Sequence, residues 1–237
     1  MRLDVLVTQN GLAESRERAQ ALIIAGKVRV AGETIRRPDR TVSDDASISV
    51  DDAPGYASRG ALKLGPALAT FGVDPSGLVC ADIGASTGGF TDVLLRRGAA
   101  RVYAIDVGRG LLHWRLRQDP RVVVVERVNA RELEAFPEAV SLIVVDVSFI
   151  GLEKVLPALR RAAPTAQVIA LFKPQFQVGR TEVGKGGIVR DPVAIEAALE
   201  AIRSWCAANG YSVKGEAPSE LAGADGNHEI FLDLIPA

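Results

Sequence analysis

Cysteine is scarce in this sequence: Cys80 and Cys206 are the only two among 237 residues. Both stand among apolar neighbours, which favours buried free thiols in a reducing compartment over a disulfide framework. No apolar run approaches the roughly 18 residues that a bilayer-spanning helix needs, and residues 1–4 lack the apolar core of a signal peptide. These absences predict a cytoplasmic protein that is neither secreted nor inserted into a membrane.

A large net charge of either sign is also lacking: 28 basic and 29 acidic side chains give a formal net charge of −1. Apolar residues make up 48% and charged residues 24% of the chain, an ordinary globular composition that excludes a disordered or fibrous protein. A length of 237 residues predicts one or two domains with a real core. Partners must therefore be inferred from local patterns.

One segment, residues 15–40, departs from this balance, with seven basic and three acidic side chains. A solvated surface is the usual fate of scattered charge, but basic side chains gathered on one small unit are typical of phosphate contacts. The residues predicted to bind RNA are Arg16, Arg18, Lys27, Arg29, Arg36 and Arg37.

This basic segment belongs to a predicted first domain, residues 1–50. Apolar residues at helical spacing come first, Ser15 can cap a second helix, and residues 28–30 alternate like a strand. Residues 51–57 then combine charge, Pro and Gly with little to bury, which is typical of a linker. The remaining residues, 58–237, form the predicted second domain.

The second domain alternates apolar strands with helical stretches. Runs rich in Val and Ile without polar alternation suit a parallel sheet that helices cover on both faces. The strands predicted in this way are residues 79–83, 102–105, 122–125, 142–145 and 168–172. A helix over 193–208 precedes two last strands, at 211–214 and 229–235, and the loop between these two predicts that the last one runs antiparallel. The expected fold class is α/β, a doubly wound sheet preceded by a small α+β domain.

A glycine-rich loop follows the first strand of this sheet. Gly84 and Gly88 lie four residues apart, which does not match the G-x-G-x-x-G fingerprint of dinucleotide sites. With Asp82 just before it, the loop resembles that of S-adenosylmethionine (SAM)-dependent methyltransferases, whose cofactor carries an ammonium that a carboxylate can pair. Asp106 and Asn129 end the next two strands, where they can bind ribose and adenine. An ordinary tight turn is the alternative interpretation.

The predicted cofactor site therefore draws on successive strand ends. Its residues are Asp82, Gly84, Ser86, Thr87, Gly88, Gly89, Phe90, Asp106 and Asn129.

Four ionisable residues are expected at the same edge of the sheet: Lys63, Asp146, Lys173 and Glu229. Singly, each is most often a solvated charge or a cap. Asp146 and Lys173, however, each follow a buried apolar strand, where a charge usually needs a partner or a function. No Cys, His or acidic partner recurs at ligand spacing around either histidine, so we predict no metal site.

These four residues, with the glycine loop, resemble the Lys-Asp-Lys-Glu tetrad of the FtsJ-like ribose 2′-O-methyltransferases. The motifs SRGALKL (58–64), GASTGGFT (84–91), NAR (129–131), DVSFI (146–150), KPQF (173–176) and GNHE (226–229) further resemble the TlyA, or haemolysin A-like, family of rRNA methyltransferases over essentially the whole chain. Residues 1–50 resemble the S-four RNA-binding domain.

The resemblance implies a Rossmann-like domain that uses SAM to methylate the 2′-hydroxyl of a cytidine in rRNA or a ribosomal subunit. Large-subunit rRNA is the expected target, and small-subunit rRNA is an open second one. A ribose hydroxyl has a pKa far above 7, so Lys173 is the candidate base, Lys63 would orient the hydroxyl, and Asp146 and Glu229 would hold the lysines.

Three alternatives stay open at this point. The chain could be a non-catalytic RNA-binding protein that keeps the sheet as a scaffold. It could be a membrane-active haemolysin, although no strongly amphipathic basic helix is visible in the sequence. It could also methylate a small molecule or a protein, which the basic first domain disfavours.

Overall fold

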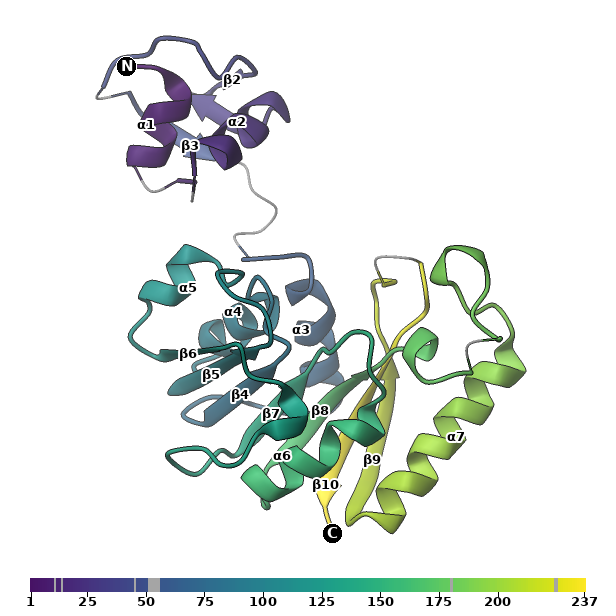
Figure 1. Cartoon of the computed structure of the whole chain (residues 1–237). Helices are drawn as coiled ribbons and strands as arrows, with labels where there is room; N and C mark the ends of the chain where they lie inside the picture. The colour runs from purple at the N-terminus through teal and green to yellow at the C-terminus, as the bar shows by residue number, and fades with distance from the viewer. Residues whose placement is uncertain (11, 14, 45, 51–55, 180, 224–225) are drawn as a thin grey trace. The chain divides into compact units, whose positions relative to one another are not determined.

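The protein is described here by a computed structural model that covers residues 1–10, 12–13, 15–44, 46–50, 56–179, 181–223 and 226–237. The chain divides into two compact units, Met1–Tyr56 and Ala57–Ala237 (Figure 1). Most of the predicted linker over residues 51–57 lies outside the described residues, because residues 51–55 are among those not covered. Each unit is described by itself.

The first unit packs two helices against a small antiparallel sheet. Its elements are α1 (Leu3–Gln9), α2 (Arg16–Ile24), β1 (Val28–Val30), β2 (Glu33–Ile35) and β3 (Ile48–Val50), with strand order β2-β1-β3. Ser15 caps α2 as predicted, since its side chain accepts a hydrogen bond from the Arg18 backbone N–H at 3.1 Å. Leu3, Ile23 and Val28 lie in the buried core of the unit.

A buried carboxylate crosslinks the helices of this unit. Asp4 on α1 is fully buried and accepts hydrogen bonds from the side chains of Arg2, Arg16 and Gln20. The Arg2 hydrogen bond, together with those of Gln20 and Arg16, holds the pKa of Asp4 well below its usual range. The charge is therefore fully compensated where it would otherwise be costly.

The second unit alternates strands and helices along the chain. Its helices are α3 (Ala61–Thr70), α4 (Gly89–Arg96), α5 (Trp114–Gln118), α6 (Leu156–Ala162) and α7 (Pro192–Ala208). Its strands are β4 (Val79–Ile83), β5 (Arg101–Asp106), β6 (Val122–Glu126), β7 (Leu142–Val145), β8 (Gln167–Phe172), β9 (Tyr211–Pro218) and β10 (Ile230–Pro236). The strands predicted from apolar runs are thus confirmed, with β9 extending four residues beyond the predicted end.

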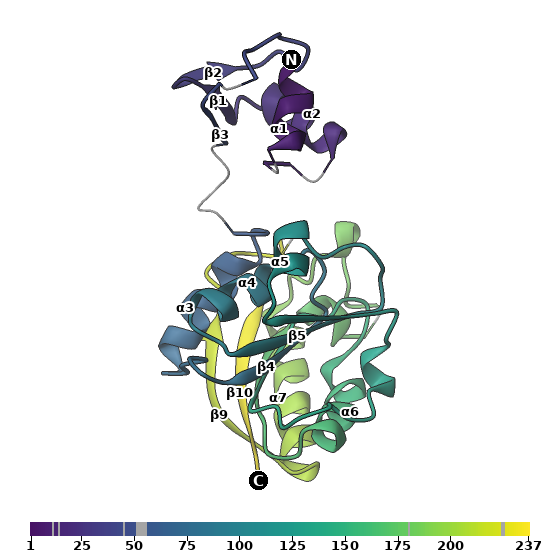
Figure 2. The same ribbon diagram turned by 90° about the vertical axis from the view of Figure 1, so that its left-hand side faces the viewer.

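These strands form one sheet in the order β6-β5-β4-β7-β8-β10-β9 (Figures 1 and 2). The strands from β6 to β8 run parallel, whereas β10 pairs antiparallel with both β8 and β9, as the connection between the last two strands predicted. Helices α6 and α7 pack on one face, and α3 and α4 contact the sheet from the other. The doubly wound fold class is therefore confirmed.

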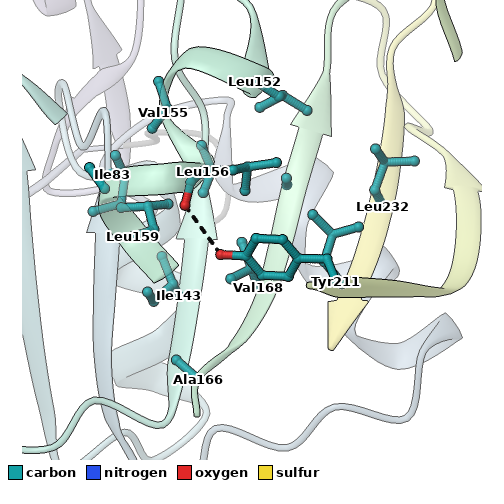
Figure 3. Close-up of a cluster of buried hydrophobic side chains, with 14 of the residues drawn as sticks. Ile83, Ile143, Leu152, Val155, Leu156, Leu159, Ala166, Val168, Tyr211 and Leu232 are labelled. Atoms are coloured by element: carbon teal, nitrogen blue, oxygen red, sulfur yellow. Dashed lines mark hydrogen bonds between the residues drawn. The ribbon is translucent and has the colours of Figure 1, made fainter. Parts of the chain in front are cut away.

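The core beneath α6 consists almost entirely of buried apolar side chains (Figure 3). Tyr211 also carries a hydroxyl, which donates a hydrogen bond to the Leu156 carbonyl oxygen at 3.3 Å. Burial raises the pKa of Tyr211 to about 12, so the phenol stays protonated. Cys80 and Cys206 are buried free thiols. Among the described residues, no helix is long and apolar enough to cross a membrane.

The pairing of β10 with β8 decides which residues meet at the edge of the sheet. Ile230 lies opposite Phe172 in the antiparallel register. Glu229 comes one residue before β10 and Lys173 one residue after β8, so continuing the register brings these two residues to the same edge of the sheet. On the other side, Ile83 lies beside Val145, which brings the glycine loop after β4 against Asp146 after β7. Segments far apart in sequence thus converge at one edge.

Candidate active site

A cavity of about 560 Å³ opens where the parallel strands end. This volume lies within the range of about 300–1,000 Å³ that is usual for small-molecule sites. The ends of β4, β5, β6 and β7 all contribute to its wall, through residues that include Gly84, Asp106, Asn129 and Asp146. This is the edge at which doubly wound sheets bind their ligands.

The glycine loop borders this cavity because its backbone takes paths that side chains would block. Gly84 has φ +83°, and an added Cβ would meet the backbone carbonyl oxygen of Asp146. Gly88 has φ +93° just before α4, and an added Cβ there would meet side-chain atoms of Leu112 and Leu116. Gly84 therefore lets the ends of β4 and β7 approach, whereas Gly88 faces away from the cavity toward α5.

Asp82 is the buried acid of the loop. Its Oδ2 accepts hydrogen bonds from the backbone N–H of Thr91 at 2.8 Å and from the Thr91 hydroxyl at 2.6 Å. Its Oδ1 is buried without a hydrogen-bond partner among the described residues. Burial raises the pKa of Asp82 to about 7, with the nearby Asp146 carboxylate adding to the shift. A cation placed here would satisfy the unpartnered oxygen.

A smaller cavity of about 190 Å³ adjoins Asp82. It shares Gly84, Ser86 and Asp146 with the larger cavity, so the two lie side by side along the loop. Thr87, Gly89 and Phe90, predicted from the loop, line only the smaller one. Together the cavities form an elongated site with the orphaned carboxylate oxygen toward one end.

Asp106 and Asn129 lie on the wall of the larger cavity, as their strand ends predicted. The carboxylate of Asp106 is fixed by two backbone N–H groups, Ser86 at 2.8 Å to Oδ2 and Gly108 at 2.7 Å to Oδ1. Each oxygen retains a lone pair for another donor. The side-chain oxygen of Asn129 accepts a hydrogen bond from the Arg131 N–H at 3.2 Å, which leaves its amide N–H₂ for a ligand.

The four predicted ionisable residues form two ion pairs. Lys63 Nζ lies 2.6 Å from Glu229 Oε2, and Lys173 Nζ lies 2.5 Å from Asp146 Oδ1. The lysine side chains are only 14% and 11% exposed. Asp146 borders both cavities, whereas Lys63, Lys173 and Glu229 line neither of the two. The Lys173–Asp146 pair adjoins the glycine loop through Asp146, whose carbonyl oxygen an added Cβ at Gly84 would meet.

Several cavity residues were not anticipated from the sequence. Ser58 and Gly60 lie in the smaller cavity, and the larger one is also lined by Val107, Leu111, Ser148, Phe149, Ile150 and Lys154. Val107, Leu111 and Phe149 are large apolar side chains in loops, yet they are 71%, 46% and 92% exposed. An apolar residue next to a polar strand end is the signal that would have identified them.

The six basic residues predicted to bind RNA lie in the first unit. Arg16 bonds the buried Asp4 at 2.9 Å, and Arg37 pairs with Asp39 at 3.2 Å. The guanidinium of Arg36 lies against Gly26, whereas Arg18 and Arg29 are exposed and Lys27 is half-buried. Part of the basic charge therefore serves the fold of the unit itself.

A mostly parallel sheet, a glycine loop at its carboxyl edge and an elongated cavity with acids at successive strand ends define a Rossmann-like methyltransferase domain. The chain belongs to the FtsJ-like methyltransferase family, whose sequence profile matches residues 56–234, and the profile of the S4 domain matches residues 1–48. The family predicted from the motifs is thus confirmed. Among the described residues, no group of three or more His, Cys, Asp or Glu side chains could hold a metal ion.

Similarity to individual proteins extends along the whole chain. The 16S/23S rRNA (cytidine-2′-O)-methyltransferase TlyA of Mycobacterium tuberculosis is 48% identical over 98% of this chain and 89% of its own length. The Brachyspira hyodysenteriae protein named Hemolysin A is 40% identical over 99% of this chain and 100% of its own length. A solved structure from Streptococcus thermophilus matches with a TM-score of 0.76 and 42% identity, covering 100% of this chain and 88% of that one.

Proposed function

We propose that this protein transfers the methyl group of SAM to the ribose 2′-hydroxyl of a cytidine in ribosomal RNA. The observation that carries the proposal is the pair Lys173–Asp146, whose Asp146 lines a cavity that suits an adenosine cofactor, together with the buried pair Lys63–Glu229. The 48% identity to an rRNA (cytidine-2′-O)-methyltransferase supports the substrate class. Large-subunit rRNA is the target we favour, with small-subunit rRNA as a second.

The residues of the cavity suit SAM. Asp106 would accept hydrogen bonds from the ribose hydroxyls, Asn129 would meet the adenine edge, and the unpartnered Oδ1 of Asp82 would face the ammonium. The loop residues that line the smaller cavity, Gly84, Ser86, Thr87, Gly89 and Phe90, would shape the backbone around the methionine moiety, and Gly88, with φ +93°, would let the loop turn into α4. When bound, SAM supplies a methyl group on a sulfonium, which is electrophilic without further activation.

The paired lysines would act on the nucleophile. As the 2′-oxygen attacks the methyl carbon, its proton must leave, and Lys173 in its neutral form would accept that proton at Nζ. Asp146 then holds the resulting ammonium at 2.5 Å. Lys63, held by Glu229, would stabilise negative charge that develops on the oxygen. Alignment of the hydroxyl with the methyl group supplies a further part of the rate.

The mouth of the cavity carries a group suited to a nucleobase. Phe149 is 92% exposed, follows the loop of Asp146, and its ring centroid lies 5.2 Å from that of Phe176. An exposed aromatic ring beside the reacting atoms can stack on an unpaired base. We assign Phe149 to the base of the target nucleotide or of its neighbour, and the basic residues of the S4 domain to RNA phosphates.

Because ribosomal RNA is the proposed substrate, the cytoplasm is the proposed place of action. The deciding experiment compares rRNA from cells with and without the protein by mass mapping of ribose methylation. We expect one 2′-O-methylcytidine to disappear in the absence of the protein and to return with the wild-type chain, but not with a Lys173→Ala variant. Identical methylation maps, or a lost base methylation instead of a ribose one, would contradict the proposal.

A further inference from the structure

Among the described residues, two side chains hold the ammonium of Lys173, and only one of them belongs to the tetrad. Lys173 Nζ lies 2.5 Å from Asp146 Oδ1 and donates a hydrogen bond to Ser148 Oγ at 3.1 Å. Both acceptors come from the short loop that follows β7. The Asp146 contact is an ion pair without hydrogen-bond geometry, since Asp146 Oδ1 has no hydrogen-bond partner among the described residues, so the bond to Ser148 is the one that directs an N–H of Lys173.

The second acceptor changes what the ion pair can do. An ammonium with a single carboxylate partner can pivot about that contact, because the long lysine side chain has several rotatable bonds. The ion pair with Asp146 holds the position of Nζ, and the directional hydrogen bond to Ser148 fixes its rotation about the Cε–Nζ bond. The direction of the other N–H groups, or of the lone pair after one proton leaves, is then set by the protein before any substrate arrives.

The backbone around Ser148 supports a functional reason for this loop. Phe149 has φ +64°, in the left-handed region that a bulky residue rarely adopts. This turn lies directly after Ser148, and Asp146, Ser148 and Phe149 all line the larger cavity. Backbone strain of this kind persists where the surroundings enforce it, and it gathers at functional sites. The hydroxyl of Ser148 is therefore presented to Lys173 at the cavity wall.

We propose that Ser148 is a positioning residue for Lys173, one that acts through the lysine ammonium and not through the RNA or SAM. The inference rests on the proposed function, since Lys173 matters only if the ribose hydroxyl reacts beside it. It adds to the ionic tetrad a neutral hydroxyl that orients Nζ without adding charge to a site where the carboxylates of Asp146 and Asp106 already raise the pKa of Asp82.

The kinetic test uses the full chain, SAM and an rRNA fragment that contains the mapped cytidine. Ser148→Ala should lower kcat about tenfold, the worth of a hydrogen bond to a charged group, and leave KM for SAM and RNA within about twofold. Ser148→Thr, which keeps the hydroxyl, should restore most of kcat. Ser141→Ala is the matched control, because Ser141 is an exposed serine just before the opposite end of the same strand.

A double-mutant cycle separates action through Lys173 from action on the substrate. In a Lys173→Ala background, Ser148→Ala should cost nothing further, because its partner is already gone. A full additional loss in that background, a change confined to KM, or a kcat of Ser148→Ala equal to wild type would each overturn the inference.

A second measurement needs no RNA and so remains decisive if the proposed function fails. Lysine ammonium groups that are held by two acceptors give ordered, slowly exchanging ¹⁵N signals. We expect the Lys173 ammonium signal to be ordered in the wild-type protein and in Ser141→Ala, and to lose order in Ser148→Ala. An equally mobile ammonium in all three proteins would overturn the positioning role. Wild-type protein without rRNA methylation, but with this pattern of order, would count against the proposed function alone.

Discussion

Lys63 and Glu229 meet at 2.6 Å although 166 residues separate them in the sequence. Lys63 lies on α3, the first helix of the methyltransferase domain, and Glu229 directly precedes β10, its last strand. The two side chains are only 14% and 3% exposed, so each charge depends on the other for compensation. The contact ties the beginning and the end of the domain together beside the proposed catalytic residues.

The role of Lys173 can be resolved by two substitutions. Lys173→Ala should bind SAM and RNA nearly as well as wild type yet lose at least about 10²-fold in kcat, the usual worth of a positioned acid or base. Lys173→Arg should rescue little, because a guanidinium stays protonated. Single-turnover kinetics measure both, and Lys214→Ala on the exposed face of β9 is the control. An active arginine variant would show that positive charge suffices.

Asp106 is predicted to dominate the ribose contact. Asp106→Ala should weaken SAM binding by roughly tenfold to a hundredfold, the loss of one or two charge-assisted hydrogen bonds. Calorimetry on the folded variant measures this directly. Asp106 also accepts hydrogen bonds from the backbone N–H groups of Ser86 and Gly108. Asp106→Asn keeps one side-chain oxygen, so its SAM affinity should lie between those of wild type and Asp106→Ala. Unchanged affinity in both variants would remove Asp106 from the site.

The raised pKa of Asp82, about 7, predicts a pH dependence of cofactor binding. The carboxyl is mostly protonated at pH 5.5 and ionises as the pH approaches 7, and only the ionised form pairs with the ammonium of SAM. Affinity should therefore rise between pH 5.5 and 7, by up to about tenfold per unit. Asp82→Asn should flatten the profile. A flat profile in the wild-type protein would contradict the assignment.

The same pKa has a consequence for folding. An unfolded chain releases the Asp82 proton near pH 4, whereas the folded chain holds it until about pH 7. This group therefore contributes stability at low pH that is lost as the pH rises through that interval. Without SAM, the melting temperature of the wild-type protein should therefore fall relative to that of Asp82→Asn as the pH rises from 4 to 7.

Arg16 and Arg18 offer a matched pair in the S4 domain. Arg16→Ala removes a hydrogen bond to the buried Asp4 and should lower the free energy of unfolding by about 1 kcal/mol. Arg18→Ala should leave stability unchanged but make the salt dependence of RNA binding shallower by about one unit, the loss of one phosphate contact. Fluorescence titrations at several salt concentrations test this. A salt slope that stays the same would exclude Arg18 from the interface.

Phe149→Ala should raise KM for RNA by roughly fivefold to a hundredfold, the range for loss of one base-stacking contact. SAM binding should change little, because the ring lies at the mouth of the cavity and is almost fully exposed. Phe149→Tyr, which keeps a flat ring, is the control. Equal KM values for Ala and Tyr variants would show that the ring does not contact RNA.

The sequence was sufficient for the parts of the fold that depend on local pattern. Apolar runs such as residues 142–145 are apolar on both sides, as a parallel strand covered on both faces requires, and β7 is buried along its whole length. The loop between the last two strands likewise predicted the antiparallel direction of β10. Acids and lysines directly after these strands had to meet at the edge, because the ends of parallel strands share one edge.

Ion pairs between side chains that are distant in the sequence could not be predicted from it. Sheet register and the turn of each loop decide that Lys63 pairs with Glu229 and Lys173 with Asp146. Ser148 gave no signal, because an exposed serine after a strand is common. The engagement of Arg16 with Asp4 was hidden for a related reason: the acid occupies an otherwise apolar helical face, and burial is visible only once the helices pack.

The insertion of β10 between β8 and β9 has a consequence for how the protein matures during synthesis. Until residues 230–236 have left the ribosome, β9 has no strand to pair with and β8 presents an open edge. The pairing of β9 with β10 is local, but the contact of Glu229 with Lys63 spans 166 residues, and contacts of such sequence separation close slowly. Glu229 reaches Lys63 only at that stage. A nascent chain can therefore assemble its glycine loop early, but the proposed catalytic tetrad becomes complete in one of the last steps of folding.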